Sequence, residues 1–231
     1  MEPKTLENTE IRKRDRSKSN ESRRKQLIEA TIESIAIHGF NKTTLSTVTS
    51  IAKMSHGIVN FHFQSKDQLL LEAMKYLVDE HSNHWRAGLG KAKKSAADQL
   101  LALIATDFDP EIANPKRLAV WFAYWGEANN RPAYREIADN KDSQRREQIK
   151  LLCEALIKNG DYANINSNVF TTNLEALIDG LWLHLLLFPN TIDTLQARQN
   201  CLTYLASNFP RHFSSTTDGI AITRVPAAIR T

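Results

Sequence analysis

Cysteine is scarce in this chain of 231 residues. It occurs only at Cys153 and Cys201, and apolar residues surround both in stretches with helical periodicity. Two isolated thiols cannot form the set of bridges that stabilises small secreted domains. We therefore expect two reduced cysteines in the core and no disulfide framework.

Long apolar runs are also absent. No run in the sequence approaches the roughly 20 apolar residues that cross a bilayer. The charged N-terminus is not followed by the apolar stretch of a secretory signal. The sequence therefore predicts neither a membrane span nor export, and a cytoplasmic location is expected.

The motifs of common enzyme classes are missing too. The chain has no Gly-rich phosphate loop, no H-E-x-x-H, no G-x-S-x-G and no Cys/His pattern with zinc spacing. His81 and His84 stand three residues apart on an expected helix, but no third or fourth metal ligand is evident. The Glu-x-x-His repeats of a di-metal helical bundle are absent as well. We therefore predict no catalytic residue, no metal site and no cofactor, and an enzyme is the least favoured class.

Positive charge is concentrated at the N-terminal end. The formal net charge is +4, and residues 1–66 hold 12 Lys and Arg against 7 Asp and Glu. This distribution is expected where one end of a protein meets nucleic-acid phosphates. Residues 1–21 are polar and basic, so we expect a flexible arm there. The arm either follows a DNA backbone or minor groove or is a solvated tail, and the sequence favours neither.

The residues that follow have the pattern of two short helices joined by a tight corner. Thr43 or Thr44 can cap the first helix. Its apolar residues recur on one face: Leu45, Val48, Ile51 and Ala52. Ser55 can cap a second helix that ends near Phe61, with Ile58 and Val59 turned inward. The outward side chains would be those of His56, Gly57, Asn60 and Phe61.

A third helix is expected to begin directly after this pair. Ser65-Lys66-Asp67-Gln68 has the form of a capping box, in which the first and last side chains satisfy free backbone donors. A second helix with a small-residue start and a polar outer face suits insertion into a DNA major groove. The alternative is an ordinary corner between two helices of a bundle.

The segment resembles the DNA-binding half of TetR-family repressors. The matching residues are Thr43, Thr44, Leu45, Val48, Ser55, Gly57, Val59, His62, Phe63, Ser65, Lys66, Asp67 and Leu69. Thr49, Lys53 and Asn60 stand where the family often has Ala, Gly and Tyr. The resemblance implies a helix-turn-helix that binds double-stranded operator DNA. The expected DNA-binding residues are Ser55, His56, Asn60 and Phe61 near the bases, Thr43, Thr44, His62 and Lys66 on phosphates, and Gly57 in the first turn of the second helix.

Helical periodicity continues through most of the chain, and no strand is predicted. The first helix is expected from about Ser22 to His38, with Gly39 after its end. The prediction is an all-α protein with an N-terminal three-helix domain and a C-terminal helical domain. Its parts are a flexible basic arm (1–21), a helix-turn-helix domain (22–66), a ligand-binding and dimerisation domain (67–209) and a flexible tail (210–231).

The penultimate expected helix, from about Asn168 to Leu187, is more apolar than a monomer needs. One stripe comprises Leu174, Leu177, Ile178, Leu181 and Leu185. A second face of this helix, about a quarter-turn away, also carries large or charged side chains. We expect the leucine stripe to form a two-fold symmetric homodimer through a four-helix bundle. An intrachain core is the alternative.

Large aromatic residues gather in two short segments. The first contains Trp121, Tyr124 and Trp125, and Trp182 ends the second. Glu175 and Asp179 precede Trp182 at helical spacing and share its face. Aromatic faces beside carboxylates bind quaternary ammonium groups by cation–π attraction, although core packing would explain the aromatics equally well. The expected ligand-binding residues are Trp121, Tyr124, Trp125, Glu175, Asp179 and Trp182.

This half of the chain resembles the regulatory domain of BetI-type repressors, the choline-responsive branch of the TetR family. The segments WFAYW, RPAYREI and ALIDGLWLHLLL carry the resemblance, which spans roughly residues 22–209 with the N-terminal half. It implies a homodimeric repressor of the genes that convert choline to glycine betaine, with choline or a related quaternary ammonium compound as effector. The alternatives are a TetR-like repressor with another small-molecule ligand and a DNA-binding protein with none.

Overall fold

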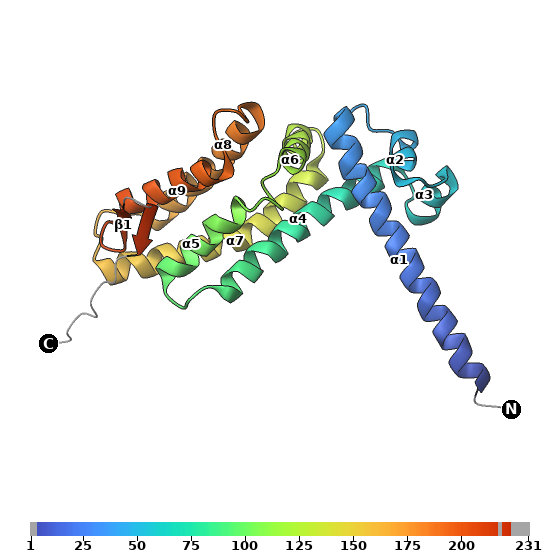
Figure 1. Ribbon diagram of the computed structural model, residues 1–231, viewed down its shortest axis with the longest axis horizontal. Coiled ribbons are helices and arrows are strands. Elements are labelled where there is room, and N and C mark those ends of the chain that lie inside the picture. The colour runs from blue at the N-terminus through green and yellow to red at the C-terminus, as the bar shows by residue number, and fades with distance from the viewer. Residues whose placement is uncertain (1–3, 217–218, 223–231) are drawn as a thin grey trace. The chain divides into compact units, whose positions relative to one another are not determined.

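The computed structural model describes residues 4–216 and 219–222. These residues form nine helices and one antiparallel pair of strands (Figure 1). The elements are α1 (Lys4–His38), α2 (Leu45–Ala52), α3 (His56–His62), α4 (Lys66–Lys91), α5 (Ala96–Asp107), α6 (Pro115–Glu127), α7 (Pro132–Gly160), α8 (Ser167–Leu187), α9 (Thr194–Asn208), β1 (Phe213–Thr216) and β2 (Gly219–Ile222). The expected all-α class is confirmed. No described helix has the length and apolar content to cross a membrane.

The chain divides into two compact units, Met1–Tyr76 and Leu77–Thr231. The boundary falls inside α4, so this one helix belongs to both units. In the first unit α1 packs against α2, and α2 against α3. One face of α1 is buried: Leu27, Ile28, Thr31, Ile32 and Ile35. Gly39 follows α1 with a φ of +79°, a conformation that glycine adopts without a Cβ penalty.

The N-terminal end of α1 differs from the prediction. The helix begins at Lys4 rather than near Ser22, and it extends well past α2 and α3 (Figure 1). Residues 4–21, expected as a flexible arm, are therefore helical. The prediction weighed the lack of apolar side chains. It gave too little weight to the good helix formers Lys, Arg and Glu and to the absence of Gly and Pro between Lys4 and His38.

In the second unit, α7 packs against α5 and α8, and α8 also packs against α6 and α9. Cys153 and Cys201 lie unbridged in this core, as expected, with no exposed surface. Burial raises the pKa of each thiol to about 12. Both thiols therefore remain protonated and unreactive at neutral pH.

The leucine stripe of α8 has a different role from the one expected. Leu174, Ile178, Leu181 and Leu185 are all buried within their own chain, and Leu177 is partly exposed. The prediction that this stripe meets a second chain is therefore wrong, because the neighbouring helices α6, α7 and α9 already cover it. The alternative, an intrachain core, is correct for these residues.

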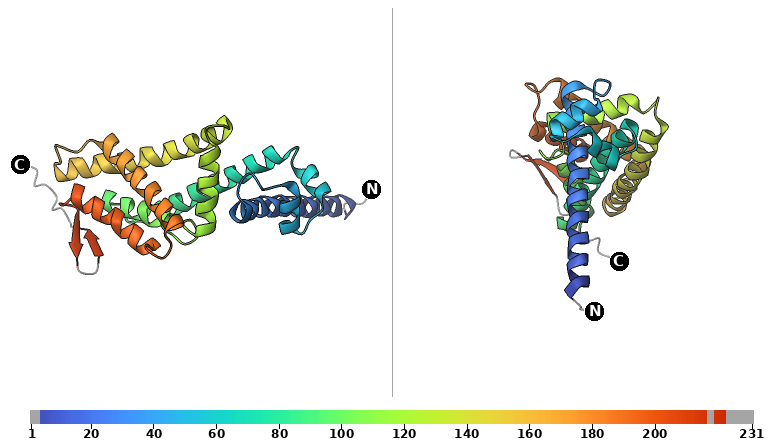
Figure 2. Two further views of the ribbon diagram at one scale, coloured as in Figure 1. Left: turned by 90° about the horizontal axis from the view of Figure 1, so that it is seen from above. Right: turned by 90° about the vertical axis from the view of Figure 1, so that its right-hand side faces the viewer.

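Two strands follow α9 where an irregular tail was expected. β1 and β2 pair antiparallel, with Phe213 opposite Ile222, and both pack on α9 (Figure 2). Phe209 and Phe213 are buried, so the chain stays attached to the helices after α9 ends. The strands are too short for a clear period in the sequence. The rest of the expected tail, residues 217–218 and 223–231, lies outside the described residues.

The end of α7 is held against the segment between α9 and β1. The backbone N–H of Arg211 donates to the Tyr162 hydroxyl over 2.8 Å, and Tyr162 Oη lies 3.1 Å from His212 Nδ1. Both rings crowd Gly160, the last residue of α7. A Cβ at this position would lie 2.2 Å from Tyr162 Cε2 and 2.7 Å from His212 Cε1.

Gly160→Ala should therefore lower the free energy of unfolding of the C-terminal unit by about 1–3 kcal/mol, because the new methyl group displaces two packed rings. Urea denaturation followed by tryptophan fluorescence measures the change. Gly90→Ala in α4 is the control, since a Cβ there meets no atom within 4 Å. Equal free energies of unfolding of the two variants would show that the two rings move aside without a loss of stability.

Candidate functional site

The α2–α3 corner is fixed by local hydrogen bonds. Thr44 caps α2: its hydroxyl accepts from the Thr47 N–H over 3.1 Å, and the Thr47 hydroxyl accepts from the Thr44 N–H over 2.9 Å. Lys53 ends α2 in the left-handed region with a φ of 54°. This lysine stands where glycine is common in the family pattern, and it adopts the turn that glycine would favour. The hydroxyl of Thr49 is buried but donates to the Leu45 carbonyl.

The outward face of α3 carries most of the residues expected near DNA bases. Ser55, His56, Gly57, Asn60 and Phe61 are all exposed, and Val59 is buried. The outward side chains are as predicted, whereas of the two residues expected to turn inward only Val59 is buried and Ile58 is partly exposed. Phe61 is 71% exposed, which is unusual for so large an apolar side chain. A solvent-facing aromatic next to polar groups fits a surface that contacts another molecule.

The residues expected on phosphates differ in their exposure to solvent. Thr44 is exposed, while Lys66 and His62 are partly buried. Thr43 is 1% exposed; its hydroxyl donates to the Gly39 carbonyl and accepts from Ser34. Its side chain therefore holds the corner together and is not available to a phosphate.

Two arginines that the sequence interpretation did not single out lie beside α3. Burial lowers the pKa of His62, and the nearby charges of Arg24 and Arg23 lower it further. Arg24 also lies over the Phe63 ring, 5.4 Å from its centroid, and pairs with Glu72 on α4. The basic side of α1 thus meets the end of α3. The only sequence signal for this was the excess of positive charge before Lys66.

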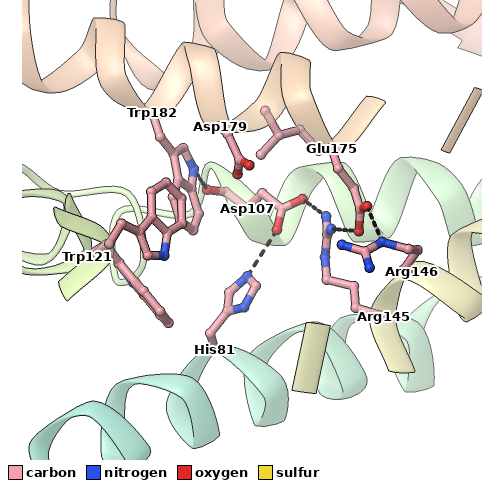
Figure 3. Close-up of a pocket in the computed structure, with 10 residues that line it drawn as sticks. His81, Asp107, Trp121, Arg145, Arg146, Glu175, Asp179 and Trp182 are labelled. Atoms are coloured by element: carbon pink, nitrogen blue, oxygen red, sulfur yellow. Dashed lines mark hydrogen bonds and ion pairs between the residues drawn. The ribbon is translucent and has the colours of Figure 1, made fainter. Parts of the chain in front are cut away.

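A pocket of about 90 Å³ opens in the C-terminal unit (Figure 3). Helices α4, α5, α6, α7 and α8 all contribute side chains to it. The lining residues are His81, Asp107, Trp121, Trp125, Arg145, Arg146, Glu175, Ile178, Asp179 and Trp182. Five of the six residues predicted to bind a ligand are among them. The two aromatic segments found in the sequence therefore meet in space.

Three indole rings form one side of this pocket. Trp125 stacks on Trp182 with centroids 6.4 Å apart and an interplanar angle of 14°. Trp121 lies 6.3 Å from Trp182 and 6.2 Å from Trp125 in tilted orientations. Rings arranged this way offer several π faces to a single small volume, which is the geometry that favours an organic cation.

Tyr124 is the one predicted ligand residue that lies elsewhere. Its side chain has no exposed surface, and its ring packs edge-on against Tyr134 with centroids 5.3 Å apart. Burial raises the pKa of its hydroxyl well above the usual value, and the charge of Tyr134 adds to the effect. Tyr124 is adjacent in sequence to Trp125 but projects from a different side of α6, so it belongs to the core.

Asp107, at the end of α5, is the residue of this pocket that the sequence interpretation missed most clearly. Its side chain is 1% exposed. One carboxylate oxygen lies 3.1 Å from His81 Nε2, and the other accepts from the Arg145 guanidinium. Its backbone carbonyl accepts from the Trp182 indole N–H over 2.8 Å. An acidic residue at the end of the apolar run LLALIATD was the available signal.

The other charged residues of the pocket come from α7 and α8. Glu175 accepts from Arg146 Nε over 2.7 Å and lies 3.8 Å from Arg145. Asp179 projects from the next turn of α8 into the pocket (Figure 3). Three carboxylates and two guanidinium groups therefore line the site, giving a formal charge of −1 when His81 is neutral. This balance suits a ligand with one positive charge.

No group of three or more possible metal ligands occurs among the described residues. His81 is paired with Asp107, and His84 Nε2 lies 3.5 Å from Asp109. The arrangement can hold an organic cation between aromatic faces and carboxylates.

Comparisons with known proteins match both halves of the chain to known families. The family model "BetI-type transcriptional repressor, C-terminal" matches residues 96–210, and "Bacterial regulatory proteins, tetR family" matches residues 27–73. The HTH-type transcriptional regulator BetI of Paraburkholderia xenovorans is 32% identical over 188 residues, which cover 80% of this chain and 92% of that protein. BetI 1 of Chromohalobacter salexigens is 29% identical over 83% of this chain and 93% of its own length.

Solved structures agree with these matches. A transcriptional regulator from Pseudomonas aeruginosa PAO1 has a TM-score of 0.72 and 28% identity, over 81% of this chain and 90% of that chain. A regulator from Saccharomonospora viridis, solved in complex with choline, has a TM-score of 0.71 over 80% of this chain and 96% of that chain. At 23% identity the second similarity establishes a shared fold.

Proposed function

Because the chain belongs to the BetI group of TetR-family transcriptional regulators, we propose that its α2–α3 corner binds operator DNA and that a choline-like cation enters the pocket of Figure 3 and releases the operator. The regulated genes are those that convert choline to glycine betaine. The protein acts in the cytoplasm, where such operators lie, and it catalyses no reaction. The observation that carries the proposal is the cluster of three indoles beside three carboxylates within the BetI-type region.

DNA recognition rests on α3 and the residues next to it. Asn60 is exposed on α3, and an amide side chain can bond both to the N6 amino group and to N7 of adenine. Thr44 caps the start of α2, and Lys66 is the first residue of α4. Helix starts present free N–H groups that favour phosphate oxygens. The domains proposed for these roles are 22–66 for DNA and 67–209 for the ligand and the dimer.

Lys66→Ala should weaken binding to every duplex and lower the slope of log affinity against log salt by about one unit. Asn60→Ala should instead change the preference among operators, with about 1–3 kcal/mol lost on the best site. Fluorescence anisotropy with labelled duplexes at several salt concentrations measures both effects. Lys91→Ala, at the opposite end of α4, removes the same charge and should leave binding unchanged. An unaltered salt slope in Lys66→Ala would refute this docking of α4.

A second chain fits the face of α8 that the first chain leaves open. The exposed residues recur at alternating spacings of four and three: Val169, Asn173, Ala176, Gly180, Leu183 and Leu187. This is the spacing of helices that pack side by side. Ala176 and Gly180 are small, and a Cβ at Gly180 would meet no atom within 4 Å, so a partner helix can approach closely. Leu195, on the neighbouring helix α9, is 73% exposed as well. We place the homodimer contact here.

Leu183→Glu should dissociate the dimer, since it places a charge in the apolar contact between two α8 helices. Sedimentation velocity at micromolar concentration distinguishes the two species. Leu151→Glu is the matched control: Leu151 is 51% exposed but lies on α7, outside this face. Two variants that both sediment like the wild type would place the interface elsewhere.

The proposed ligand is small and singly charged. A pocket of about 90 Å³ with a formal charge of −1 matches a compact monocation better than a long-chain acyl ligand. Trp121, Trp125 and Trp182 present their faces, and Asp179 and Glu175 supply negative potential. The choline complex of the structurally similar S. viridis regulator supports the choice of ligand. Two or three aromatic faces with a carboxylate would give an affinity of about micromolar to millimolar.

Calorimetry should show choline binding to the wild type, and Trp125→Ala should weaken it by about 0.5–2 kcal/mol, because one cation–π face is lost. Trp125 is partly exposed, so its truncation disturbs the core less than that of Trp121 or Trp182. Phe122→Ala, on the same helix but outside the pocket lining, is the control. Absence of heat with the wild type, or equal affinity in all three proteins, would exclude the aromatic site.

A further inference from the structure

His81 is the one pocket residue that comes from α4. Its ring centroid lies 5.8 Å from that of Trp182 and 6.2 Å from that of Trp121. The imidazole plane is nearly perpendicular to both indoles, at 74° and 76°. The side chain is 13% exposed and is one of those that line the pocket. In Figure 3 it closes the pocket on the side opposite α8.

The hydrogen bond to Asp107 indicates which ring nitrogen of His81 carries the proton when the imidazole is neutral. His81 Nε2 lies 3.1 Å from the Asp107 carboxylate, which also accepts from Arg145. An ionised carboxylate only accepts hydrogen bonds, so Nε2 is the donor. Neutral His81 therefore carries its proton on Nε2, and a second proton would go to Nδ1. That second proton would place a positive charge at the wall of the proposed ligand site.

We infer that His81 forms part of the wall of the ligand site. We further infer that uptake of a second proton by His81 and binding of the ligand cation are mutually exclusive. The inference rests on the proposed function and extends it to the control of ligand affinity. Neutral imidazole presents a π face to a quaternary ammonium group, as the three indoles do. Imidazolium repels the same ligand across a few ångströms of poorly solvated space.

The other charges around His81 do not remove this competition. Asp107 faces it from α5, Arg145 and Arg146 line the pocket from α7, and Glu175 and Asp179 line it from α8. Asp107 and Glu175 already pair with arginines. With His81 protonated the pocket has a formal charge of zero rather than −1, so the attraction for a monocation is lost. Ligand affinity should therefore fall when His81 takes up a second proton.

Tetramethylammonium and choline are the probes, titrated by calorimetry at intervals between about pH 8 and pH 5.5, where histidine is the side chain that commonly titrates. Tetramethylammonium has no group that hydrogen-bonds, so it reports on the aromatic walls and the charge of the pocket without a hydrogen-bond contribution. The wild type should lose affinity for both probes toward the acid end of this range, because binding to the protonated protein requires release of a proton.

His81→Phe keeps an aromatic wall and removes the titrating group. At about pH 8 its affinity for both probes should lie within about threefold of that of the wild type. Most of the dependence of affinity on pH should be lost. His84→Phe is the matched control: it removes a histidine one turn further along α4 that pairs with Asp109 and does not line the pocket. This control should keep the wild-type pH profile. His81→Gln, which keeps an N–H donor for Asp107, replaces His81→Phe if the latter does not fold.

The outcomes separate the inference from the proposed function. A wild type that binds neither probe at about pH 8 would overturn both. A wild type that binds both probes with a constant affinity down to about pH 5.5 would overturn the inference alone. So would a His81→Phe or His81→Gln protein that retains the full pH dependence, since the carboxylates would then be its source.

Discussion

The buried carboxylate of Asp107 is the interaction on which the C-terminal unit depends. A charge with 1% exposure is strongly unfavourable unless partners compensate it. Here His81 and Arg145 share its two oxygens, and its backbone carbonyl accepts from Trp182. One residue at the end of α5 therefore joins α4, α7 and α8. The same contacts orient Trp182 so that its face, rather than its N–H edge, is left for a ligand. The shape of the pocket is thus a consequence of how one acidic group is neutralised.

Much of the fold follows from local signals in the sequence. Helix α6 (Pro115–Glu127) begins where Asn114 caps it and Pro115 fixes its first turn, both of which are local signals. The buried stripe of α1 and the outward face of α3 also followed from helical periodicity. The same rule brought Trp121, Trp125 and Trp182 to one site, since each lies on the inward side of its helix. It failed for Tyr124, which lies between them in sequence and belongs to the core.

The charged part of the pocket was not predictable in the same way. Arg145 lies 38 residues from Asp107 in a helix that looks solvated, and only the packing of α5 against α7 brings the two together. The leucines of α8 presented the opposite difficulty. Periodicity shows that Leu174 and Leu181 are buried, but it cannot show whether the covering surface belongs to the same chain or to another. The small residues Ala176 and Gly180, on the exposed face, are the better sign of a second chain.

Control of transcription requires that the ligand prefer one of two states of the protein. Helix α4 is suited to connect them, because it begins at Lys66 in the DNA-binding unit and carries His81 into the pocket. The most direct test of this account is to titrate choline into the free protein and into its complex with operator DNA, and operator DNA into protein with and without choline. The account predicts that each ligand weakens the other by the same factor, about 5–150-fold. Equal choline affinity for free and DNA-bound protein would contradict it.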